Sequence, residues 1–98
     1  MALNQTNKLV WIVETIYRAH KISFEELNRR WIDNVDLSGG EEMLKRTFHK
    51  WKGNILDTFG LNIECEKAAP YRYYIANVDD MKSGSIEKWL LSTLSVGN

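Results

Sequence analysis

The segment 41–60 constrains the fold of this chain more than any other stretch of its sequence. Its large apolar residues recur at steps of four, three, four and four, so on an α-helix they form one continuous stripe. A stripe of this kind has to pack against a core. Its members are Leu44, Phe48, Trp51, Ile55 and Phe59.

The ends of this segment carry the expected helix signals. Ser38 and Glu41 have the Ser-x-x-Glu spacing of a capping box, and Glu41 and Glu42 would place carboxylates in the first turn. Gly60 is suited to end the helix, because an achiral residue adopts the left-handed conformation readily. The sequence therefore predicts one helix over residues 41–60.

The remaining faces of this helix are basic. No acidic residue occurs between Lys45 and Leu56, and with His49 neutral the segment carries four positive charges, on Lys45, Arg46, Lys50 and Lys52. A solvated surface helix has a similar appearance, so spacing alone assigns no function. The order of the surrounding elements decides how this helix is interpreted.

Two amphipathic helices are expected before it. The first runs from residue 6 or 7 to about residue 20, with Leu9, Ile12, Val13 and Ile16 on one face. The second runs from residue 24 to about residue 35, after a second Ser-x-x-Glu signal at Ser23. Residues 36–40 should break it.

After residue 60 the pattern changes from helical to alternating. Leu61, Ile63 and Cys65 would lie on one side of a strand, and Tyr71, Tyr73 and Ile75 on one side of a returning strand. Residues 67–70, which contain the only proline, make the turn of a hairpin.

A linker is expected over residues 77–84, followed by a last helix that opens at residue 85. Ile86, Trp89, Leu90 and Leu94 would share one face of that helix. Because only four residues follow this apolar segment, we expect the natural chain to continue beyond it.

Composition restricts the other possibilities. A chain of 98 residues allows one modest core, and its 13 basic residues balance its 13 acidic residues, so attraction to phosphate depends on local placement of charge. Cys65 has no partner for a disulfide, and the sequence shows no zinc-ligand spacing, secretory signal or membrane span. It also lacks paired carboxylates, a nucleophilic triad and a glycine-rich phosphate loop. We therefore expect a cytoplasmic protein that is not an enzyme and needs no cofactor or metal.

Three helices, the third of them basic, followed by a two-stranded hairpin, form the element order of a winged helix-turn-helix. The predicted fold is therefore α+β, with a three-helix core, a β-hairpin wing and an extra C-terminal helix. In this arrangement the third helix enters the major groove of DNA, and the wing approaches the backbone or the neighbouring minor groove.

Several runs of residues resemble the N-terminal DNA-binding region of WYL-domain transcriptional regulators, especially those of Bacteroidetes. The runs are residues 46–51 (Arg-Thr-Phe-His-Lys-Trp), 59–65 (Phe-Gly-Leu-Asn-Ile-Glu-Cys), 73–75 (Tyr-Tyr-Ile), 11–17 (Trp-Ile-Val-Glu-Thr-Ile-Tyr), 22–27 (Ile-Ser-Phe-Glu-Glu-Leu) and 85–96. The resemblance implies a winged helix-turn-helix over residues 1–77. It also implies that residues 78–98 lead toward a WYL sensor domain that this chain lacks.

The same resemblance implies the partners. They are double-stranded DNA, a second copy of the chain in a full-length homodimer, and an effector bound by the absent C-terminal region. The residues expected to contact DNA are Lys45, Arg46, His49, Lys50 and Lys52 on the third helix, and Lys67 and Arg72 on the wing.

On the third helix these residues form two strips. Lys45, His49 and Lys52 lie along one, and Arg46 and Lys50 along the other, so one is expected to meet bases and the other phosphate. The sequence leaves open which strip does which. On the wing, Glu64 and Glu66 would repel DNA unless their side chains turn away.

A second hypothesis is that the fold serves as a protein-interaction or dimerisation module without a direct DNA role, which the zero net charge suits. The two hypotheses differ in where the charges fall. A DNA-binding domain needs an exposed, continuous basic strip on the third helix. An interaction module would show an exposed aromatic patch there, with its basic residues paired to acids. A third reading is a weak DNA binder that depends on the missing region to dimerise.

Overall fold

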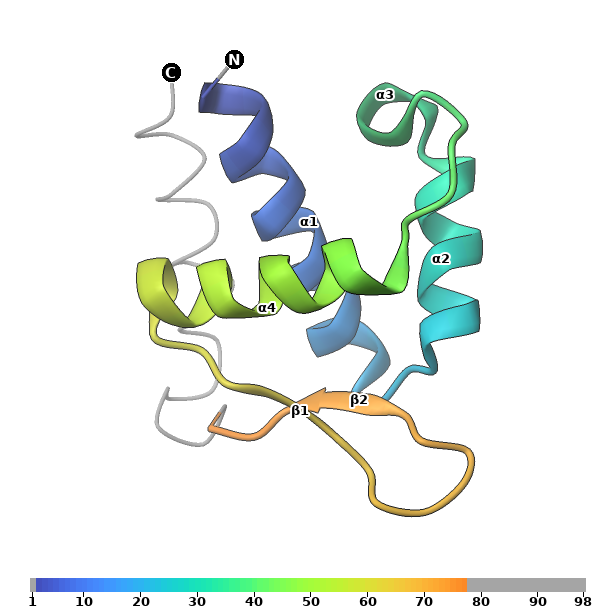
Figure 1. Cartoon of the computed structure of the whole chain (residues 1–98), viewed down its shortest axis with the longest axis vertical. Coiled ribbons are helices and arrows are strands. Elements are labelled where there is room, and N and C mark those ends of the chain that lie inside the picture. Colours follow the sequence, from blue (N-terminus) through green and yellow to red (C-terminus); the bar gives the residue numbers. More distant parts are fainter. Residues whose placement is uncertain (1, 78–98) are drawn as a thin grey trace.

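The computed structural model describes residues 2–77, with side chains from Asn7 onward, and shows an α+β fold (Figure 1). A helical part comes first and a two-stranded antiparallel hairpin follows it. The elements are α1 (Ala2–Ala19), α2 (Phe24–Asp33), α3 (Val35–Ser38), α4 (Lys45–Phe59), β1 (Ile63–Cys65) and β2 (Tyr73–Ile75). Residues 78–84 of the expected linker and the last helix expected from the sequence lie outside the described residues.

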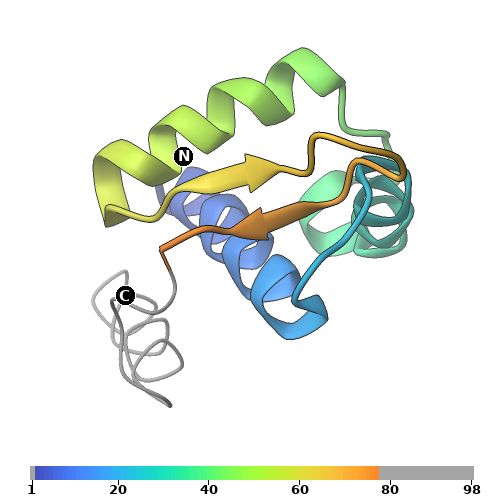
Figure 2. The ribbon, with the colours of Figure 1, turned by 90° about the horizontal axis from the view of Figure 1, so that it is seen from below.

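The core is formed where α1, α2 and α4 meet above the hairpin. Its fully buried side chains are Phe48, Ile12, Ile16, Leu27, Ile55 and Val13. The predicted apolar face of the first helix is therefore confirmed, although α1 begins at Ala2, before the predicted start. Seen from below, the hairpin lies across one end of the helices, with α4 along one side of it (Figure 2).

The start of α2 follows the sequence signal. The Ser23 hydroxyl accepts a hydrogen bond from the Glu26 amide at 3.1 Å, which caps the helix. The helix ends at Asp33, however, and a short separate helix, α3, occupies residues that were expected to end α2 and to form the break after it.

The predicted capping box at Ser38 is wrong. Ser38 ends α3, where its hydroxyl donates to the Ile32 carbonyl at 3.3 Å and accepts from the Gly40 amide at 2.9 Å. The Asn28 side chain accepts a hydrogen bond from the Met43 amide at 2.7 Å and so fixes the chain before α4 in a non-helical path. For this reason α4 begins at Lys45, and the predicted helix start at residue 41 is also wrong.

This late start changes which residues are buried. Met43 is only 3% exposed, whereas Leu44, which the stripe placed in the core, is 46% exposed. Phe48 and Ile55 are fully buried as predicted, and Gly60 ends α4 in the left-handed conformation with φ 72°.

The hairpin is confirmed, with shorter strands than predicted. Ile63 pairs with Ile75 and Cys65 with Tyr73, and Tyr73 also exchanges two backbone hydrogen bonds with Ile22, at 3.0 and 2.7 Å. This extra bridge ties the hairpin to the connection between α1 and α2.

Tyr71 does not share the buried side of β2 as the alternation predicted. It precedes the strand with φ 57° and is 56% exposed.

In the part of the chain that the structure describes, no helix is long and apolar enough to cross a membrane.

Candidate nucleic-acid interface

Many of the basic side chains outside α4 are paired with acids. Arg18 donates to Glu14 at 3.2 Å, and Arg30 donates to Glu26 at 3.0 Å. Further pairs join Arg29 to Glu26, Arg72 to Glu66, and Lys21 to Glu66. Three acids therefore offset part of the positive charge of five basic side chains outside α4.

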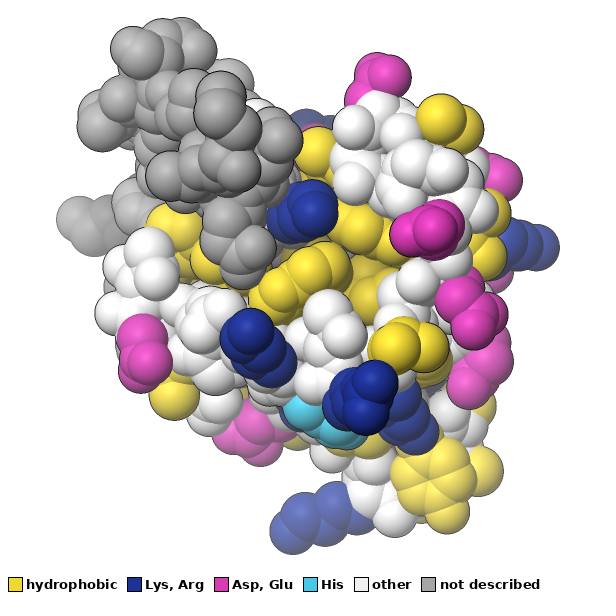
Figure 3. Space-filling view, turned by 45° about the horizontal axis from the view of Figure 1, so that its top comes forward, with side chains coloured by type: hydrophobic (Ala, Val, Ile, Leu, Met, Phe, Trp, Pro, Cys, Tyr) yellow, Lys and Arg dark blue, Asp and Glu magenta, His cyan; other side chains and the backbone are white. Residues whose placement is uncertain are grey.

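The basic residues of α4 differ. Within residues 7–77, Lys45, Arg46 and Lys50 form no ion pair with an acid, and all three are exposed. On the face that carries α4, Lys and Arg side chains gather around a histidine, while acidic side chains lie toward the edges (Figure 3). This helix therefore presents uncompensated positive charge to the solvent.

Contacts with aromatic rings show which way each of the two basic strips of α4 faces. The Lys45 ammonium lies 5.9 Å from the centre of the Phe24 ring, and that of Lys52 lies 5.0 Å from the centre of the Tyr73 ring. Phe24 begins α2, next to the hairpin connection, and Tyr73 lies in β2 of the hairpin itself. The strip of Lys45, His49 and Lys52 therefore faces the hairpin side.

Burial further distinguishes Lys52 from the others. It is half-buried over the rings of Phe48 and Tyr73, and burial lowers the pKa of its ammonium group. Lys52 therefore serves in part to pack α4 against the hairpin. Arg46 and Lys50 have no such ring contact among the described residues, and they form the strip that points outward.

The imidazole of His49 lies between these charges. Partial burial, followed by the positive charges of Lys52 and Lys45, lowers the pKa of His49 below its ordinary value of 6.5. The ring is therefore neutral at pH 7, and an anion placed beside it would favour protonation.

The start of α4 adds to the positive character of this face. Its N-cap residue is Leu44, which has no side-chain acceptor, and its first turn contains no acidic residue. The exposed amides at a helix start attract anions, and here Lys45 and Arg46 stand beside them. The sequence had placed Glu41 and Glu42 in this turn, so the structure is more basic at this point than predicted.

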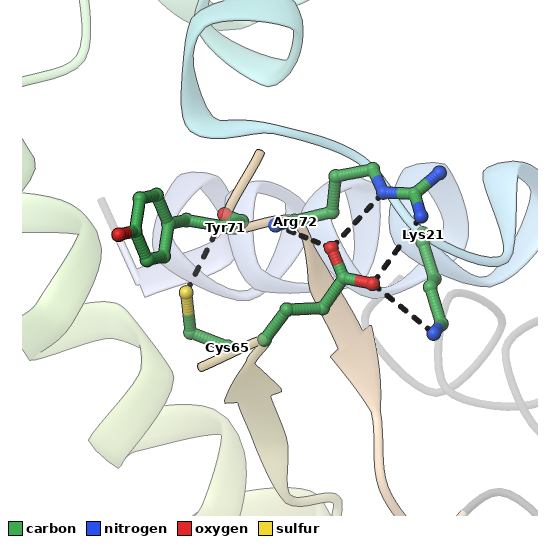
Figure 4. Close-up of polar contacts among 5 residues, drawn as sticks. Lys21, Cys65, Tyr71 and Arg72 are labelled. Atoms are coloured by element: carbon green, nitrogen blue, oxygen red, sulfur yellow. Dashed lines mark hydrogen bonds and ion pairs between the residues drawn. The ribbon is translucent and has the colours of Figure 1, made fainter. Parts of the chain in front are cut away.

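The wing residues lie in two different settings. Arg72 donates from Nε and from its backbone amide to the Glu66 carboxylate, each at 3.0 Å, and Lys21 donates to the same carboxylate at 3.2 Å (Figure 4). Hydrogen bonding to Arg72, first of all, lowers the pKa of Glu66 to about 2. Lys67 is exposed and has no ion pair within the described residues.

This arrangement limits Arg72 as a phosphate contact, because its charge is already matched by Glu66. It also removes the expected repulsion from Glu66. Glu64 remains exposed and accepts a hydrogen bond from the Asn62 side chain at 2.8 Å.

Three tryptophans connect α1, α2 and α4. Trp31 packs edge-on against Trp11 and against Trp51, each with ring centres 5.5 Å apart, and it is only 4% exposed. The Lys8 ammonium lies 5.9 Å from the centre of the Trp51 ring. The sequence had left Lys8 unassigned, since no helical spacing reveals a contact between α1 and α4.

Among the described residues, no group of three or more His, Cys, Asp and Glu side chains is placed to hold a metal ion. Cys65 is half-buried, and its thiol donates to the Tyr71 carbonyl at 3.4 Å.

No family model matches the chain, and no curated protein or solved structure matches it.

Proposed function

We propose that this chain is the DNA-binding domain of a transcriptional regulator, and that its helices and hairpin form a winged helix-turn-helix. In this proposal α4 enters the major groove and the hairpin lies near the DNA backbone. The main support is the distribution of charge. Within residues 7–77, three exposed basic residues of α4, Lys45, Arg46 and Lys50, form no ion pair, whereas the arginines outside α4 are paired with acids: Arg18, Arg29, Arg30 and Arg72.

The two strips of α4 take different roles. Arg46 and Lys50 point outward, and their donors suit the O6 and N7 acceptors of guanine in the major groove. Lys45 and His49 face the hairpin side and suit backbone phosphate. Gly53 continues the outward strip, and the space around its Cα is open, so the helix can approach DNA closely there.

The competing interaction-module hypothesis requires an aromatic patch in place of this strip. Among residues 7–77, the large apolar side chains that are more than 40% exposed are instead scattered over α3, α4, its N-cap and the hairpin connection: Val35, Leu44, Leu56 and Tyr71. The resemblance of the sequence to WYL-domain regulators supports the regulatory part of the proposal. The same proposal includes a full-length protein that forms a homodimer and binds an effector through a C-terminal region.

The experiment is fluorescence-anisotropy titration of labelled duplex DNA across a salt series. Binding should weaken steeply with salt, with a log–log slope of about −0.9 for each phosphate contacted. The double variant Arg46→Ala/Lys50→Ala should lose most of this affinity. Its matched control, Arg18→Ala/Arg30→Ala, removes the same charge from paired residues outside α4 and should bind like the original chain.

Two results would contradict the proposal. Equal losses in the two double variants would mean that binding depends on total charge and not on α4. An absence of binding at low salt would mean that this domain does not bind DNA by itself.

A further inference from the structure

The connection between β1 and β2 turns two neighbouring side chains in opposite directions. The Tyr71 amide donates to the Ala68 carbonyl at 2.9 Å, and the Cys65 thiol donates to the Tyr71 carbonyl at 3.4 Å. These contacts accompany the left-handed backbone of Tyr71, with φ 57°. As a result, Arg72 points toward Lys21 while the Tyr71 ring points to the other side (Figure 4).

The side that Tyr71 faces is the side of α4. A hollow of about 260 Å³ lies there between the hairpin connection, the start of α2 and the start of α4. Its lining includes Tyr71 from the hairpin and Lys45 from α4, with Phe24 and Tyr73 forming apolar walls. Arg72 instead lines a separate hollow with Lys21.

Two hydrogen-bond donors are thus available at one hollow. Tyr71 is 56% exposed, and the Lys45 ammonium forms no ion pair with an acid within residues 7–77. A phenol and an ammonium group both donate to phosphate oxygens. A space of this kind holds one water from about 10–15 Å³ upward, so the hollow has room for a phosphate group. Glu25 is the one acid of the lining, and its side chain is exposed.

We propose that Tyr71 and Lys45 together hold one backbone phosphate of the DNA duplex. Tyr71 then takes the phosphate contact that the sequence assigned to Arg72. This inference rests on the proposed function, since it assigns a phosphate to the hairpin side of the same interface. It also explains how the hairpin contributes to DNA binding although Arg72 is hydrogen-bonded to Glu66.

The test is a double-mutant cycle measured by the same anisotropy titration. Tyr71→Phe keeps the ring and removes only the hydroxyl, so the fold is retained. It should weaken binding about tenfold, the typical effect of losing a hydrogen bond to a charged group, and it should leave the salt slope unchanged because tyrosine is neutral. Lys45→Gln should weaken binding and also make the slope shallower by about 0.9.

The combined variant tests whether one phosphate is shared. If both side chains hold the same group, the double variant loses less affinity than the product of the two single losses. The matched control is Tyr74→Phe. This hairpin tyrosine lies under the Lys21 ammonium, 5.4 Å from it, and its hydroxyl should not affect binding.

The possible failures are distinct. If Tyr71→Phe binds like the original chain while Arg46→Ala/Lys50→Ala does not, the inference is wrong and the proposed function stands. Independent losses in the cycle would also overturn it, because they would place the two side chains on separate phosphates. If the original chain does not bind DNA, the proposed function and the inference fail together.

Discussion

Replacement of Phe48 by alanine tests the packing that positions the proposed interface. Phe48 is fully buried, with its ring centre 5.5 Å from that of Phe24 and 4.9 Å from that of Tyr73, the latter in an edge-on contact. It therefore joins α4 to α2 and to the hairpin at one point. Its loss should loosen the elements that carry Lys45, Lys52 and Tyr71.

The expected cost follows from this burial. Truncation of a buried phenylalanine to alanine costs about 3–5 kcal/mol, from lost transfer energy and the cavity left behind. Small domains are stable by about 5–15 kcal/mol in total, so the variant would retain a reduced margin. For a domain of this size each kcal/mol shifts the melting temperature by about 4–8 °C, which predicts a fall of at least about 12 °C.

The assay is urea and thermal unfolding followed by far-ultraviolet circular dichroism. Leu44→Ala is the matched control, because the sequence places Leu44 in the same stripe whereas the structure exposes 46% of it. It should change the free energy of unfolding by about 0.5 kcal/mol or less. Equal costs for the two variants would mean that α4 starts earlier and that Leu44 is buried. A cost below about 1 kcal/mol for Phe48→Ala would refute the packing described for its ring.

Two pH dependences follow from the shifted groups. Bound phosphate favours the protonated imidazole of His49, whose pKa in the free protein lies below 6.5, so DNA affinity should rise as the pH falls through this value. In anisotropy titrations, the DNA affinity of His49→Gln should depend less on pH than that of the original chain. The control His20→Gln should keep the original pH dependence. An unchanged pH dependence in His49→Gln would place His49 away from phosphate. The pKa of Glu66 is lowered from 4.5 to about 2, so this carboxylate contributes stability that is present above pH 4.5 and lost as the pH falls toward 2. Urea midpoints of Glu66→Gln should therefore fall less over that interval than those of the original chain, and parallel curves would argue against the pairs with Arg72 and Lys21.

Periodicity predicted those parts of the fold that depend on local pattern. The apolar face of α1, the buried Phe48 and Ile55, the cap at Ser23 and the glycine end of α4 were all visible in the sequence. The same Ser-x-x-Glu pattern failed at Ser38. There the deciding contact is the hydrogen bond between Asn28 and Met43, which are far apart in the chain, and no local pattern contains it.

The candidate site was predictable in its composition but not in its geometry. The sequence identifies every basic residue of α4, yet the ring contacts of Lys45 and Lys52 that separate the two strips depend on where Phe24 and Tyr73 lie. On the hairpin, strict alternation predicts Tyr71 facing the core and Arg72 free in solvent. The left-handed backbone at Tyr71 interrupts that alternation and exposes the tyrosine, while Glu66 takes the arginine.

The zero net charge, which the sequence alone counts against DNA binding, has a different meaning once the pairs are placed. Glu14, Glu26 and Glu66 form ion pairs only with basic residues outside α4, so their negative charge offsets positive charge on other elements. Coulomb attraction is screened within about 8–10 Å at physiological salt, so a phosphate near α4 responds to Lys45, Arg46 and Lys50 more than to the sum over the chain. A chain with zero net charge therefore still presents a locally positive face to DNA.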